Sequence, residues 1–176
     1  MGRKYWPDKL VRLLDCYLLT KNEKDLGKLL RWLGKPWMDF NILYNVYTEL
    51  KERDVRIVAA DLPEMFLELR QKIFDLMLRG AVHNRYDRYK LYSLYEIAEK
   101  EGRADEVLAI IDHCAEIGHK GYDARTWEFF WASFPDTKLS KLAEKKLEEL
   151  GKPLPEMTAE EKSLLVIQMI MGSVAA

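Results

Sequence analysis

Glycines divide the chain into stretches that each have the apolar spacing of a helix. The dividing residues, each following a stretch rich in Leu, Ile or Met, are Gly34, Gly80, Gly118 and Gly151. They lie 46, 38 and 33 residues apart, and the sequence Gly-Lys-Pro occurs at both 34–36 and 151–153. Self-similarity at a few tens of residues is typical of proteins built from repeated helix pairs. The chain is therefore predicted to be an array of helical hairpins.

Apolar side chains recur at helical spacing through almost the whole sequence, which predicts an all-α fold. Leu10, Leu14 and Tyr17, for example, fall on one face of the first helix. Only the run 55–60 has a strand-like composition, and we expect it to connect two helices. The predicted helices cover residues 8–20, 23–33, 37–53, 61–79, 87–101, 104–117, 124–134, 136–150 and 158–172.

Particular residues are expected to begin and end these helices. Asp8 and Asp61 are predicted N-terminal caps, and Thr158 with Glu161 forms a capping box before the last helix. Gly34 is expected to adopt the left-handed conformation that commonly ends a helix.

The helices pair into four predicted hairpins, which cover residues 8–34, 37–80, 87–118 and 124–151 of one domain, 1–176. A single hairpin cannot bury its own apolar face, so neighbouring hairpins must stack. The predicted fold is an α-solenoid of about four stacked hairpins. Because the helix at 158–172 is apolar on more than one face, it either caps the stack or binds a partner.

Residues 89–123 resemble a pentatricopeptide repeat. Tyr89 begins the unit, Gly102 lies in its turn, Gly118 closes it and Asp123 follows. The remaining hairpins match less well, and tetratricopeptide repeats are the nearest alternative, although their pattern of Trp, Gly, Ala and Pro is missing. The pentatricopeptide resemblance implies an organellar RNA-binding adaptor in which Ser93 and Asp123 select a base.

A basic and aromatic cluster is the candidate RNA-binding surface that accompanies this resemblance. It contains Arg85, Arg88, Tyr89 and Lys90. The chain as a whole has 28 basic and 29 acidic residues and a net charge of −1. Because positive charge supplies much of the affinity for RNA, protein is the more strongly expected partner.

In size, near-neutral charge and irregular repeats the chain is similar to the accessory F1 subunits of euglenozoan mitochondrial ATP synthases. This resemblance implies a non-catalytic subunit in the mitochondrial matrix that lies on the outside of the ATP synthase α subunit. The unequal intervals between the glycines also favour a protein partner, because an array that selects one base per unit should keep its period. Tryptophans are enriched where proteins meet. The candidate contact residues are Trp6, Trp37, Trp127 and Trp131, of which Trp6, Trp37 and Trp131 are expected to be exposed.

No catalytic, metal or cofactor site is predicted. Glu116 and His119 have a spacing found in metal-binding helices, but Gly118 separates them and no further ligands complete a site. Cys16 and Cys114 are too few for a disulfide framework, so we expect two buried thiols in a reducing intracellular compartment. The first residues lack a secretion signal and no apolar run is long enough to span a membrane, which predicts a soluble protein.

Overall fold

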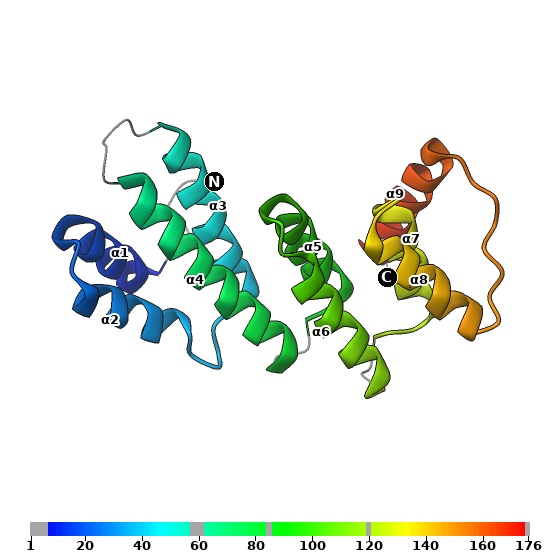
Figure 1. Cartoon of the computed structure of the whole chain (residues 1–176), viewed down its shortest axis with the longest axis horizontal. Helices are drawn as coiled ribbons and strands as arrows, with labels where there is room; N and C mark the ends of the chain where they lie inside the picture. The colour runs from blue at the N-terminus through cyan, green and yellow to red at the C-terminus, as the bar shows by residue number, and fades with distance from the viewer. Residues whose placement is uncertain (1–6, 57–61, 84–85, 119–120, 175–176) are drawn as a thin grey trace. The chain divides into compact units, whose positions relative to one another are not determined.

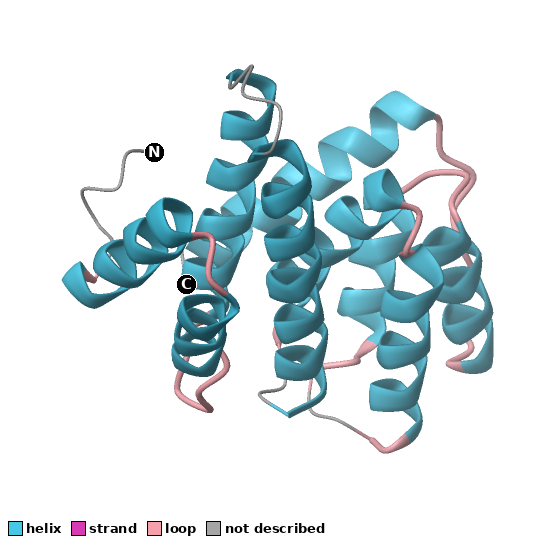
Figure 2. Cartoon of the chain, turned by 60° about the vertical axis from the view of Figure 1, so that its left-hand side comes forward, coloured by secondary structure: helices cyan, strands magenta, loops and turns pink. Residues whose placement is uncertain are grey.

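The computed structural model describes residues 7–56, 62–83, 86–118 and 121–174, and all the regular structure within them is helical (Figure 2). The prediction of an all-α fold is confirmed. The helices in these ranges are α1 (Asp8–Thr20), α2 (Glu23–Leu33), α3 (Phe40–Arg56), α4 (Leu62–His83), α5 (Arg88–Glu101), α6 (Ala104–Glu116), α7 (Ala124–Ser133), α8 (Lys138–Glu149) and α9 (Ala159–Val174).

The helices group into two compact units, which we call unit 1 (Met1–Arg85) and unit 2 (Tyr86–Ala176). Unit 1 contains the hairpins α1/α2 and α3/α4, and α2 also contacts α4 (Figure 1). Unit 2 contains the hairpins α5/α6 and α7/α8, and α9 packs on α7. The four predicted hairpins are therefore confirmed as helix pairs. A continuous solenoid and a single domain over 1–176 stay predictions.

Gly34 ends α2 in a way that the sequence did not predict. Its φ is −84° and its ψ is 9°, so the expected left-handed conformation is wrong. A Cβ atom added here would lie 3.1 Å from the Leu30 carbonyl oxygen and 3.3 Å from Cδ2 of Leu76. Leu76 belongs to α4, so the missing side chain lets α4 approach the end of α2 closely.

Gly80 does not end α4, contrary to the prediction. The helix continues through it to His83, and Ala81 immediately after it is buried. A glycine inside a helix costs about 1 kcal/mol relative to alanine, which packing of the final turn can offset. α3 begins at Phe40, three residues later than predicted, and the Asp39 carboxylate accepts a hydrogen bond from the backbone N–H of Asn41 at 2.6 Å.

Several other predicted helix ends can be checked. The capping box before α9 is confirmed: Glu161 accepts from the Thr158 backbone N–H at 2.7 Å, and the Thr158 hydroxyl accepts from the Glu161 N–H at 3.3 Å. Gly151 after α8 has a φ of 66°, and the following N–H returns to the Leu147 carbonyl at 2.9 Å. Asp8 as a cap is wrong, because Asp8 is the first residue of α1 and Pro7 precedes it. Asp61 and residues 57–60 lie outside the described residues.

Aromatic side chains join the two hairpins of unit 2. Phe134, at the end of α7, has ring-centre distances of 4.8 Å to both Tyr92 and Tyr95 of α5. Phe129 of α7 lies 5.5 Å from Tyr89. The second helices of the hairpins are joined by ion pairs: Lys138 to Asp105 at 2.6 Å and Lys146 to Asp112 at 3.0 Å. First helix therefore faces first helix within this unit, and second faces second.

Candidate functional site

The tryptophans proposed as protein contacts lie in different environments. Trp37 is 62% exposed, as expected. The expectation that Trp131 is exposed is wrong, because its side chain is covered and only 3% of the residue is accessible. Trp127 is also buried, at 2%, and Trp6 lies outside the described residues. Trp37 is the predicted contact residue that the structure leaves accessible.

Trp131 is buried because two helices cover it. Its Nε1–H donates a hydrogen bond to Glu144 of α8 at 3.2 Å. The ammonium nitrogen of Lys162, from α9, lies 4.2 Å from the centre of the indole ring. A cation at this distance over an indole is attracted to the ring face. Trp131 therefore holds α8 and α9 against α7 within unit 2.

The basic and aromatic cluster predicted to bind RNA is largely engaged in local packing. The guanidinium carbon of Arg88 lies 5.0 Å from the ring centre of Tyr89 and 5.7 Å from that of Phe129. Arg88 also donates to the Tyr89 hydroxyl at 3.0 Å. Lys90 is half-buried, and its backbone N–H is bound by the Asp87 cap at 2.9 Å. Arg85 lies outside the described residues.

The proposed base-selecting pair is also constrained. Ser93 is half-buried in α5, and Asp123 precedes α7. The Asp123 carboxylate accepts a hydrogen bond from the Thr126 backbone N–H at 2.9 Å, so it caps that helix. A base at this position would compete with the cap.

The two cysteines differ in exposure. Cys114 is buried, as expected, whereas Cys16 is exposed, so the prediction for Cys16 is wrong. Among the described residues, no group of three His, Cys, Asp or Glu side chains could hold a metal ion, and His119 lies outside them. None of the helices in the described part of the chain is both long and apolar enough to cross a bilayer.

The outer side of α9 carries a contiguous apolar stripe. Its members lie three, three and one residues apart and are between 43% and 67% exposed: Leu164, Ile167, Ile170 and Met171. The opposite side of the helix faces α7, with Met169 buried and Lys162 over the Trp131 ring. Single exposed apolar residues are common, whereas a contiguous group is a candidate interaction surface. We call these four residues the α9 stripe.

Two neighbouring grooves in unit 1 have several basic residues in their lining. The first, about 320 Å³, lies between α1 and α2, and its lining includes Lys9, Arg31, Trp32 and Lys35. The second, about 530 Å³, lies between α2 and α4, and its lining includes Arg31 and Arg79. Arg31 therefore lines both, and we call them together the basic grooves.

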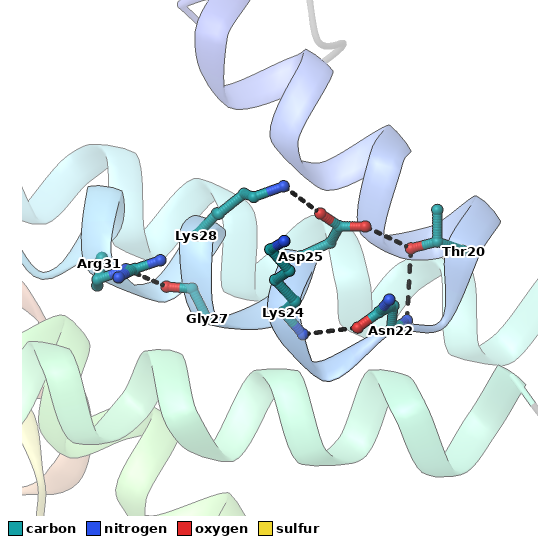
Figure 3. Close-up of polar contacts among 7 residues, drawn as sticks. All are labelled: Thr20, Asn22, Lys24, Asp25, Gly27, Lys28 and Arg31. Atoms are coloured by element: carbon teal, nitrogen blue, oxygen red, sulfur yellow. Dashed lines mark hydrogen bonds and ion pairs between the residues drawn. The ribbon is translucent and has the colours of Figure 1, made fainter.

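A hydrogen-bond network orients the α2 side chains beside these grooves (Figure 3). Asp25 accepts from the Thr20 hydroxyl at 2.9 Å and from the Lys28 ammonium at 2.7 Å. The hydrogen bond from Lys28 lowers the pKa of Asp25, and the reciprocal bond raises the pKa of Lys28. Nε of Arg31 donates to the Gly27 carbonyl at 3.2 Å, which holds the stem of the side chain along the helix.

The charge of the chain is divided unequally between the units. Unit 1 has 16 basic and 12 acidic residues, a formal charge of +4, whereas unit 2 has 12 basic and 17 acidic residues, a charge of −5. The total of −1 conceals this division, and the basic grooves were not predicted. A usable signal was present, because Lys28, Arg31 and Lys35 follow one another at helical intervals of three and four.

Trp37 lies beside the first groove, because it contacts Trp32 and Lys35, which line that groove. Its ring lies 5.8 Å from that of Trp32, nearly perpendicular to it, and Lys35 Nζ lies 5.4 Å from its centre.

Comparisons of the chain with protein-family models, with curated proteins and with solved structures find no match. The pentatricopeptide and F1-subunit resemblances therefore stay predictions.

Proposed function

We propose that the chain is a non-catalytic accessory subunit that binds a folded protein in a larger assembly. The observation that carries this proposal is the α9 stripe. A helix that only capped the end of a bundle would present a polar outer side, because the terminal units of repeat proteins need one for solubility. α9 packs on α7 and still presents four large apolar side chains to solvent.

A folded protein suits this stripe better than a membrane surface does. Helices that lie on anionic membranes carry Lys and Arg along their polar side. In α9 the first turn is acidic, with Glu160 and Glu161, and Lys162 is placed over Trp131. Apolar side chains flanked by acidic residues favour a partner with an apolar patch and neighbouring cations.

The resemblance to accessory F1 subunits supplies the first partner to test, the α subunit of a mitochondrial ATP synthase, and with it a mitochondrial location. The RNA-adaptor alternative receives less support, because Arg88 covers Tyr89 and Asp123 caps α7. The function proposed here requires no bound cofactor and no chemical step by this chain.

The test is recovery of the tagged chain with its assembly from the cells that produce it, with and without ribonuclease. The disruptive variant replaces Leu164 and Ile167 by Gln, and the matched control replaces Leu19, which is 84% exposed on α1, by Gln. About half of each stripe side chain remains to be buried, so each should contribute about 1 kcal/mol to binding. The double variant should bind roughly thirtyfold more weakly, and the control should bind normally.

We expect the wild-type chain to recover the ATP synthase α subunit even after ribonuclease treatment. The double variant should not recover it. A photo-crosslinker placed at position 164 should then label that subunit, and one at position 19 should not. Partners that disappear with ribonuclease would contradict the proposal, as would a double variant that is retained like the control.

A further inference from the structure

We propose that the basic grooves bind an acidic segment of the partner protein, with Arg31 at the centre of the contact and Trp37 at its edge. This inference rests on the proposed function and adds a second contact surface, in unit 1, with a stated chemistry. Its ligand is a stretch of chain that carries several carboxylates and at least one apolar side chain.

Four of the cations that line the grooves are available to a ligand. Lys9, Arg31, Lys35 and Arg79 are all exposed, and none forms an ion pair with a carboxylate of the described residues. Lys28 and Lys72 are the exceptions, because Asp25 binds Lys28 at 2.7 Å and Glu68 binds Lys72 at 3.3 Å. The hydrogen bond with Asp25 raises the pKa of Lys28, whereas the positive charge of Arg31 lowers it by a smaller amount. Lys28 and Arg31 therefore repel each other. A ligand with carboxylates would relieve this repulsion.

Arg31 is the residue best placed to organise the contact. It lines both grooves, and its Nε–H is already bound to the Gly27 carbonyl (Figure 3). That bond restricts the side chain before a ligand arrives, so less conformational entropy is lost on binding. A guanidinium also suits the planar geometry of a carboxylate better than an ammonium does.

The apolar part of the lining favours a protein segment over RNA. Leu13 and Trp32 line the first groove, and Leu76 lines the second. Asp75 also lines the second groove, where it would repel any anionic ligand, so we expect the carboxylates of the segment to lie nearer Arg31 and Arg79. Trp37, exposed beside Trp32, offers an apolar contact of the kind enriched where proteins meet.

The direct test measures fluorescence anisotropy of labelled probes with the whole chain. The probes are a peptide of about twelve residues that repeats Asp-Glu-Leu, the same peptide with Asn and Gln in place of the acids, and an oligouridylate of equal length, all at about 0.05 M salt. The acidic peptide should bind, the amide peptide should not, and the RNA should bind more weakly than the acidic peptide. Raising the salt to about 0.5 M should weaken binding, because exposed charges are then screened.

Charge-reversal variants locate the contact. Arg31→Glu should weaken binding of the acidic peptide about tenfold, because it removes attraction in both grooves and adds repulsion. Arg31→Gln should weaken binding less than Arg31→Glu does. Arg79→Glu changes the charge of one groove only, so it should weaken binding by an intermediate amount. The control Lys141→Glu makes the same charge change at an exposed position on α8 in unit 2. Equal effects of Arg31→Glu and Lys141→Glu would overturn the proposal, as would tighter binding of the RNA.

Recovery of the assembly separates this inference from the proposed function. Arg31→Glu alone should reduce retention of the partner, as the separate Leu164 and Ile167 double variant should. If Arg31→Glu is retained like wild type while the double variant is lost, the grooves are not a partner contact and the accessory-subunit proposal stands. If neither variant affects retention, both proposals fail.

Discussion

Replacing Trp131 by alanine should destabilise unit 2 severely. The side chain is 3% exposed, its N–H is bound to Glu144, and Lys162 lies over its ring. Truncating a buried tryptophan usually costs about 3–5 kcal/mol, because transfer energy is lost and a cavity remains. The contact with Lys162 adds about 0.5–1 kcal/mol. We expect a loss of about 4 kcal/mol, which lowers Tm by roughly 15–30 °C for a cooperative unit of this size.

The assay is urea and thermal unfolding followed by far-ultraviolet circular dichroism, with two comparison variants. Trp131→Phe keeps most of the apolar area and loses the hydrogen bond to Glu144, so it should cost about 1–2 kcal/mol. Trp37→Ala removes a residue that is 62% exposed and should change stability by at most about 0.5 kcal/mol. Equal losses for Trp131→Ala and Trp37→Ala would refute the reasoning, because they would show that α8 and α9 do not enclose Trp131.

Three further predictions concern helix ends and a buried hydroxyl. Gly151→Ala should destabilise the end of α8 by about 1–2 kcal/mol in urea unfolding, because φ is 66° there and left-handed backbone is unfavourable for alanine. Thr158→Ala should cost about 1 kcal/mol and reduce the helical signal. The hydrogen bond from the Thr158 backbone N–H lowers the pKa of Glu161. Its stabilisation should therefore be present above the ordinary carboxyl pKa and disappear as the pH falls through the lowered value, a dependence that acid unfolding should show for wild type and not for Glu161→Gln. Burial, followed by the hydrogen bond with Glu99, raises the pKa of Tyr95 from 10.0 to about 12. Its stabilising effect should persist below pH 10 and disappear as the pH rises toward 12, and the late tyrosinate absorbance should be absent in Tyr95→Phe.

Local signals in the sequence predicted much of the fold. The bounds of α1 and α2 match the prediction, because the apolar spacing and the flanking residues agree at both ends. The predicted end of α4 at Gly80 was wrong, because the helix continues through this glycine to His83, where its final turn packs with Ala81 buried. Gly34 ends α2 as expected but for a reason that depends on Leu76, a residue more than forty positions away.

The candidate surfaces depended on tertiary contacts and were harder to predict. Trp131 occupies a helix so rich in aromatic residues that its exposure depends on which neighbours cover it. The sequence does not reveal that α9 returns across α7 to place Lys162 over the ring. Likewise, Lys9 and Arg79 are distant in sequence, and the grooves that share Arg31 arise only when α1, α2 and α4 pack together.

The opposite charges of the two units have a consequence for handling the protein. A chain with a pI of about 6.3 would ordinarily be purified near neutral pH on an anion exchanger alone. Here unit 1 has a formal charge of +4 and unit 2 a formal charge of −5. The molecule should therefore bind both cation and anion exchangers at low salt. Attraction between unit 1 of one molecule and unit 2 of another should also make concentrated solutions at low ionic strength prone to association, which modest salt would reverse.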